Sequence, residues 1–129
     1  MTPKELRQLW VNALRSGEFK QGKAVLRSTD NEYCCLGVLC EVAARQGLMP
    51  AGIQLGECYS YSGETKWLAP HVAELVGLNN VCGGIDMSSR ALTTMNDQGM
   101  SFDAIANFIA SEPEGLFHDV TEGSQAALG

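Results

Sequence analysis

The sequence has no apolar run close to the roughly 20 residues that a membrane-spanning helix requires. Its first residues, MTPKEL, do not combine a charged start with an apolar stretch, as a secretory signal peptide would. It also has no internal repeat and no low-complexity segment. We therefore expect a cytoplasmic protein without a membrane partner.

The cysteines form neither a disulfide framework nor a zinc-binding pattern. They are Cys34, Cys35, Cys40, Cys58 and Cys82, and an odd number without a secretion signal argues against structural disulfides. The spacing between Cys35 and Cys40 is not that of a zinc knuckle, and the two histidines form no spaced pair. We expect five reduced thiols, no metal and no cofactor, with the first three cysteines packed as small buried residues.

Positive charge is scarce except at the start of the chain. The net charge is −6 at pH 7. Residues 1–27 hold six Lys and Arg against two Glu, a balance of +4, and the remainder holds three against thirteen acids, a balance of −10. A largely acidic surface repels phosphate, so duplex DNA is not an expected partner. The basic N-terminal part favours a small anion, although solvated helix faces would also account for the split.

The pattern of apolar and capping residues predicts a mainly α protein with a small β-hairpin, an α+β fold with about five helices around one core. The predicted helices cover residues 3–16, 35–46, 70–76, 88–95 and 101–112. Short β-forming runs on both sides of a Ser-Thr-Asp-Asn turn predict the hairpin within 24–34, and a second one is possible within 48–66. One globular domain is expected over 1–118, with a loosely ordered tail over 119–129.

Some single residues carry separate expectations. Gly37 lies inside a predicted helix, where Gly costs about 1 kcal/mol relative to Ala, so we expect another backbone or a ligand to come close there. Thr2 and Glu5 form the expected capping box of the first helix, Ser88 and Ser101 are the expected N-caps of the fourth and fifth, and Gly77 is the expected end of the third. The run NDQG at 96–99 lacks the alternating acids of an EF-hand and is predicted to be a turn.

A basic, glycine-containing segment is the first candidate ligand site. It consists of Lys20, Gln21, Gly22, Lys23 and Arg27. Glycine lets backbone N–H groups approach a ligand closely, and flanking Lys and Arg side chains pair with phosphate. The spacing of a Walker A motif is missing, so a solvated turn is the alternative interpretation.

Three aromatic residues around a glycine-rich stretch complete the candidate site. Tyr59, Tyr61 and Trp67 would stack on a nucleobase or another flat ligand. They would serve equally well to close the edge of the core. The five residues of the basic segment and these three aromatics are our predicted ligand-binding residues.

Several runs of the sequence resemble a family of small proteins encoded by bacteriophages and prophages. The runs are WVNALRSGEFKQGK at 10–23, YCCLGVLC at 33–40, LAPHVAELVGL at 68–78 and TMNDQGMSFDAIA at 94–106. The cysteine-rich run is the most distinctive of them. The resemblance implies a phage accessory protein in the cytoplasm of an infected bacterial host, and it supplies no catalytic or binding residues. By association with that class, a role against host defence is expected.

Three functions remain open at this point. The first is a non-enzymatic protein that counters host defence by binding and sequestering a small anionic ligand, such as a nucleotide or cyclic nucleotide signal. The second is an inhibitor whose acidic surface blocks a host nuclease or nucleic-acid-binding protein. The third is a cysteine-dependent enzyme, for which His71 is the one plausible base. The clustered basic, glycine and aromatic residues favour the first, and a homo-oligomer is possible in each case.

Overall fold

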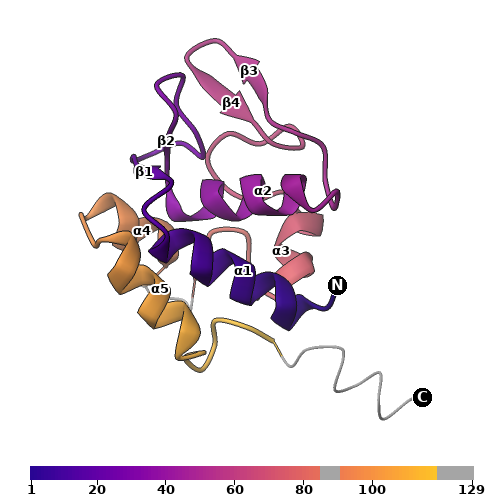
Figure 1. The fold of residues 1–129 in the computed structure, drawn as a ribbon, viewed down its shortest axis with the longest axis vertical. Helices are drawn as coiled ribbons and strands as arrows, with labels where there is room; N and C mark the ends of the chain where they lie inside the picture. Colours follow the sequence, from indigo (N-terminus) through magenta and orange to yellow (C-terminus); the bar gives the residue numbers. More distant parts are fainter. Residues whose placement is uncertain (85–90, 119–129) are drawn as a thin grey trace.

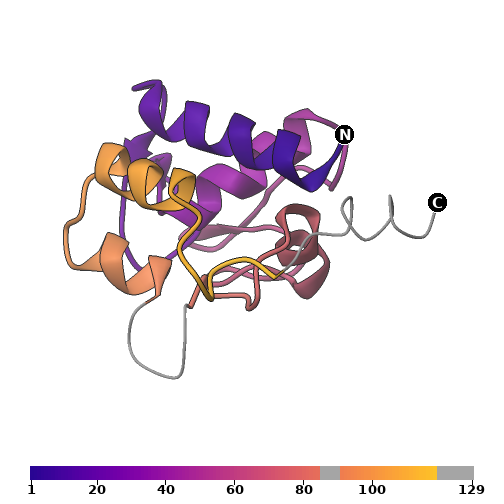
Figure 2. The same ribbon diagram turned by 90° about the horizontal axis from the view of Figure 1, so that it is seen from below.

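The computed structural model describes residues 1–84 and 91–118, which form an α+β fold as predicted (Figures 1 and 2). Within these ranges there are five helices and two sheets of two strands each. The elements are, in order, α1 Pro3–Arg15, β1 Lys20–Gln21, β2 Glu32–Tyr33, α2 Cys35–Arg45, β3 Ile53–Leu55, β4 Cys58–Ser60, α3 Pro70–Val76, α4 Leu92–Asp97 and α5 Phe102–Ala110. No helix among the described residues is long and apolar enough to cross a bilayer.

Helix α1 begins at a capping box that the sequence predicts. The Thr2 hydroxyl accepts a hydrogen bond from the Glu5 N–H at 3.1 Å, and the Glu5 carboxylate accepts one from the Thr2 N–H at 2.7 Å. The apolar stripe of the helix then faces the core, where Trp10 is fully buried and its indole Nε1 donates to the Cys35 carbonyl at 2.9 Å. This bond fixes α1 to the first turn of α2.

Helix α2 lies in the middle of the fold (Figure 1). It contacts α1 and α4, and α1 also contacts α3 and α5. Both small sheets lie on the opposite side of α2 from α1 and α5 in Figure 1. All five helices contribute to one cluster of buried apolar side chains, among them Leu6, Leu36, Val72, Leu92 and Ile105. The first turn of α2 is therefore held between α1 and α4.

The hairpin predicted within 24–34 is present only in part: an isolated antiparallel bridge joins Arg27 and Tyr33 across the predicted turn, but no antiparallel strand pair forms there. Strands β1 and β2 pair in parallel, with Lys20 opposite Glu32, and the chain between them loops out and back. Ala24 interrupts the predicted first strand, because its φ of +72° lies in the left-handed region. The small hairpin of the fold is β3–β4, antiparallel within the alternative range 48–66.

Two expectations fall on residues that the structure does not describe. Ser88, the predicted N-cap of the fourth helix, is one, and the predicted tail over 119–129 is the other. Helix α4 begins at Leu92, with Ala91 at the N-cap position. The caps of α3 and α5 agree with prediction: Gly77 ends α3 in the left-handed conformation, and the Ser101 hydroxyl accepts from the Ala104 N–H.

Candidate functional site

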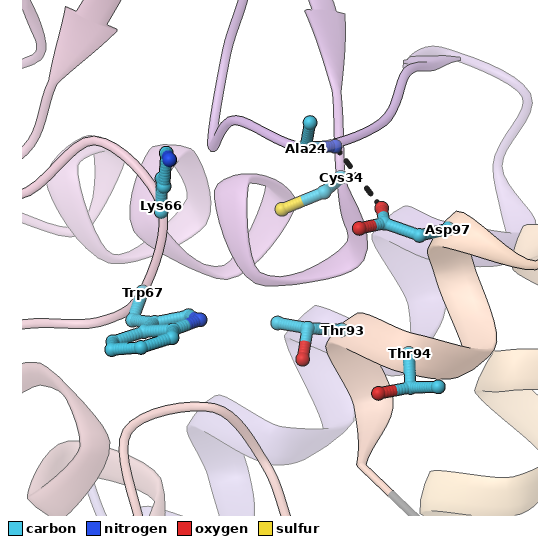
Figure 3. A pocket seen from close by; sticks show the side chains of 7 residues that line it. All are labelled: Ala24, Cys34, Lys66, Trp67, Thr93, Thr94 and Asp97. Carbon is cyan, nitrogen blue, oxygen red and sulfur yellow. Dashed lines mark hydrogen bonds between the residues drawn. The ribbon is translucent and has the colours of Figure 1, made fainter. Parts of the chain in front are cut away.

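A surface cleft of about 260 Å³ lies where α4 faces the start of α2 and the segment before α3 (Figure 3). We call it the Trp67 cleft. Its lining residues are Ala24, Cys34, Lys66, Trp67, Thr93, Thr94 and Asp97. Helix α4 supplies Thr93 and Asp97, whose four-residue separation places them along one side of the helix. The cleft thus joins four separate segments of the sequence.

Trp67 is an unusual residue for a protein surface, because its large apolar side chain is 54% exposed. The next two residues, Leu68 and Ala69, are buried and anchor the segment in the core. In Figure 3 the indole lies across the cleft from Thr93, with its ring nitrogen directed toward the cleft. Trp67 therefore offers an aromatic surface at a fixed place in the fold.

Asp97 holds the opposite wall of the cleft in place. Its Oδ1 accepts a hydrogen bond from the Ala24 backbone N–H at 3.0 Å. The left-handed conformation of Ala24 costs roughly 1–2 kcal/mol for a residue with a Cβ, and such strained residues often occur at functional sites. Figure 3 shows the Asp97 carboxylate directed toward the space enclosed by the lining residues.

Asn96 connects this wall to the rest of the fold. It is completely buried, and its Oδ1 accepts hydrogen bonds from the Cys35 N–H at 3.2 Å and from Gln21 Nε2 at 2.9 Å. Its Nδ2 donates to the Gly22 carbonyl at 2.7 Å. The sequence places Asn96 in a turn, whereas in the structure it belongs to the last turn of α4. Its partners are distant in the chain, so no local signal could have identified this role.

The structure places most of the predicted basic segment outside the cleft. Lys20 is exposed and forms an ion pair with Glu32 at 3.1 Å. Gly22 is buried against β2, where an added Cβ would come within 2.7 Å of the Glu32 Cβ, so this glycine accommodates a strand. Lys23 is exposed and directly precedes Ala24 of the cleft wall. Gln21 donates to Asn96, as described above, and also to the Met100 carbonyl at 2.7 Å.

Arg27, Tyr59 and Tyr61 do come together, but around Glu41 instead of at the cleft. The Arg27 guanidinium lies 3.9 Å from the centre of the Tyr59 ring and donates to the Tyr61 hydroxyl at 3.3 Å. That hydroxyl donates to Glu41 Oε1 at 3.0 Å. Tyr61 is fully buried, and burial raises the pKa of its phenol. Of the eight predicted site residues, only Trp67 lines the cleft.

The cysteine cluster is buried, as the sequence predicts. Cys34, Cys35 and Cys40 are each at most 3% exposed. Burial raises the pKa of the Cys34 thiol to about 11 and raises the pKa values of the other two as well. His71 is exposed, and its Nε2 lies 3.5 Å from the Ser62 hydroxyl. A thiol held in its protonated form is a poor nucleophile.

Alkylation should separate the buried thiols from the other two. With iodoacetamide at about pH 7.5, we expect Cys58 and Cys82, which are partly exposed, to be modified. We expect Cys34 to react at least about 100-fold more slowly, because a pKa raised by two units lowers its thiolate fraction by that factor. Mass spectrometry of peptides measures this, and labelling in urea is the control. Equal labelling of Cys34 and Cys82 in the folded protein would contradict the prediction.

Cation-binding residues are not grouped in the part of the chain that the structure covers, since no three His, Cys, Asp or Glu side chains converge there.

Comparison with curated proteins and with solved structures gives no match. One family does match, over residues 1–113, and its description is a domain of unknown function, DUF8296. That range includes every element of the fold and the whole Trp67 cleft. The chain belongs to the DUF8296 family.

Proposed function

We propose that the protein binds a small anionic ligand with a planar ring in the Trp67 cleft and performs no chemistry on it. The observation that carries the proposal is the exposed indole of Trp67, facing a cleft that is otherwise lined mainly by polar side chains. Stacking on an exposed aromatic ring is a common way to bind a nucleobase. The threonine hydroxyls and the Asp97 carboxylate supply the hydrogen-bonding groups that orient such a ring.

The size and charge of the cleft favour a mononucleotide. A volume of about 260 Å³ lies just below the usual range for small-molecule sites, which begins at about 300 Å³, so a dinucleotide would extend well outside it. Lys66, next to Trp67 on the rim, supplies a cation for a phosphate group. Lys23 is exposed and directly precedes Ala24 of the cleft lining, so it is a second candidate cation for the ligand. In this proposal, Lys66 and Lys23 take the phosphate-pairing role that the sequence predicts for Lys20, Lys23 and Arg27.

Sequestration fits the chemistry of the cleft better than catalysis. Cys34 is the one thiol that lines it, and burial keeps that thiol protonated at neutral pH. The resemblance of four sequence runs to phage proteins supports an origin in an infected bacterial host. In this proposal, the protein acts in the host cytoplasm and lowers the free concentration of a nucleotide that host defence uses as a signal.

Titration with nucleoside monophosphates and cyclic nucleotides tests the proposal. Calorimetry gives the affinity, and tryptophan fluorescence reports on the cleft because the second tryptophan, Trp10, is completely buried. We expect Trp67→Ala to weaken binding by about 10-fold or more, the usual loss for one stacked base. Ile53→Ala is the matched control, since Ile53 is an exposed apolar residue on the β3–β4 hairpin. Dissociation constants above about 1 mM for every nucleotide would overturn the proposal.

A further inference from the structure

The hydrogen-bonding groups of the Trp67 cleft are not equivalent. A carboxylate only accepts hydrogen bonds, whereas the hydroxyls of Thr93 and Thr94 both accept and donate. Asp97 therefore pairs with the hydrogen-bond donors of a ligand, which on the edge of a planar base are N–H groups. Among the described residues, the bonds to Asp97 from Ala24 N–H and Asn96 Nδ2 both reach Oδ1. The second carboxylate oxygen is therefore available to a ligand.

Asp97 is also held in one position before any ligand arrives. It is the last residue of α4 and follows Asn96, which is held by three hydrogen bonds, one each to strand β1, to Gly22 directly after it and to the start of α2. The bond from the Ala24 N–H fixes the direction of the carboxylate. In Figure 3, Asp97 and Trp67 approach the cleft from opposite sides. A planar ring stacked on Trp67 would direct one edge toward the carboxylate.

We infer that the cleft selects guanine among the nucleobases, with Asp97 as the residue that determines specificity. This inference rests on the proposed function. Guanine carries two adjacent donors, N1–H and the 2-amino group, that match a carboxylate in a bidentate pair. One donor would reach the open second oxygen of Asp97, and the other would share Oδ1, whose one close bond is from Ala24 N–H at 3.0 Å, since Asn96 Nδ2 lies 3.5 Å away. Adenine places a bare ring nitrogen at the same position, where it would face a carboxylate oxygen and repel it. Hypoxanthine keeps N1–H but lacks the 2-amino group, so it should bind with intermediate affinity.

Binding of GMP, IMP and AMP to the wild-type protein is the first part of the test. One good bidentate contact discriminates between bases by 1–3 kcal/mol, so we expect GMP to bind about 10- to 100-fold more tightly than AMP. IMP should fall between them. GMP methylated at N1 cannot donate from that nitrogen and should bind no better than AMP. The test with this ligand uses only the wild-type protein, so its outcome does not depend on whether a variant folds.

The variant Asp97→Asn gives the second part of the test. Its amide can still accept from the Ala24 N–H, and it can donate to the bare ring nitrogen of adenine, so AMP should become the preferred ligand. Asp103→Asn removes the same charge from an exposed position in the first turn of α5 and should leave the GMP preference unchanged. Equal binding of GMP and AMP, or tighter binding of AMP to the wild-type protein, would overturn the selectivity but leave the proposed function in place. Failure of these four ligands alone would overturn the selectivity, and failure of every nucleoside monophosphate and cyclic nucleotide to bind would overturn both.

Discussion

Replacing Gly37 by Ala is expected to lower the free energy of unfolding by about 3 kcal/mol or more. An ideal Cβ on Gly37 would lie 2.6 Å from the Leu26 carbonyl carbon and would overlap the carbonyl oxygen. Such an overlap with backbone cannot be relieved by turning a side chain. Either α2 or the segment around Leu26 must move.

Leu26 is held too firmly to move without cost. Its N–H donates to the Thr65 carbonyl at 2.7 Å, and its carbonyl accepts from the Cys34 N–H at 3.3 Å. Its side chain is completely buried. Shifting this backbone would break both hydrogen bonds and open a gap in the core, and each lost buried partner costs about 1–3 kcal/mol. We therefore expect the loss of stability to be near the upper end for a single substitution.

Gly47→Ala is the matched control for Gly37→Ala. Gly47 follows α2 with a φ of +75°, and an added Cβ there meets no atom within 4 Å. It should cost about 1–2 kcal/mol through backbone strain alone. Urea unfolding followed by circular dichroism compares the two variants. Equal stabilities for them would show that the close contact with Leu26 does not limit α2.

Features governed by neighbouring residues could be predicted from the sequence. The capping box of Thr2 and Glu5, the Ser101 cap and the left-handed Gly77 all depend on positions within a few residues of one another. The close backbone approach at Gly37 was also predicted, because a glycine within an apolar helix stripe carries a cost that needs a reason. The partner of that approach, Leu26, was not predicted.

Features that depend on distant residues could not be predicted in the same way. A parallel pairing of β1 and β2 through a loop has no hairpin signature, and the turn at 28–31 predicts only the antiparallel contact that the structure shows as a bridge between Arg27 and Tyr33. Arg27, Tyr59 and Tyr61 come together around Glu41, which lies on α2, whereas none of these three residues is on a helix. The sequence therefore predicts that the charge of Arg27 is available to a ligand, whereas in the structure its guanidinium contacts Tyr59 and Tyr61.

The residues of the candidate site also differ in whether a local sequence signal could identify them. Trp67 was found because an aromatic next to a glycine-rich stretch is a recognisable local signal. Lys66, Thr93 and Thr94 were missed, since single polar residues on short helices and loops have no pattern that separates them from ordinary surface. Asp97 was interpreted as a turn residue. Only the fold brings it opposite Trp67.

Asn96→Ala is expected to lower the free energy of unfolding by about 3 kcal/mol. After Gly37→Ala, it is the second substitution for which we expect a large loss of stability. The change would leave the Cys35 N–H, the Gly22 carbonyl and the Gln21 amide without the partner that all three share. The Cys35 N–H lies at the buried start of α2, where the helix has no side-chain cap of its own. Asn96 thus performs the role of a cap from another helix.

Asn107→Ala is the control for Asn96→Ala, because it removes an exposed asparagine from α5 whose Oδ1 accepts one hydrogen bond, from Arg15. Surface changes of this kind usually alter stability by about 0.5 kcal/mol or less. Thermal and urea unfolding of both variants provide the comparison. If Asn96→Ala proved as mild as Asn107→Ala, the buried hydrogen bonds of Asn96 would contribute little to the fold.

Asn96→Asp distinguishes the loss of a donor from the loss of the whole side chain. The introduced carboxylate can still accept from the Cys35 N–H, but it would face the Gly22 carbonyl, to which the Asn96 amide now donates. Burial and that carbonyl both favour the protonated acid, so its folded pKa should lie above the unfolded value of about 3.9. Stability should then increase as pH falls through the folded pKa, because the native state binds the proton first, and should level off near the unfolded value. Asn96→Ala carries no such group, so a similar pH dependence in both variants would rule out this explanation.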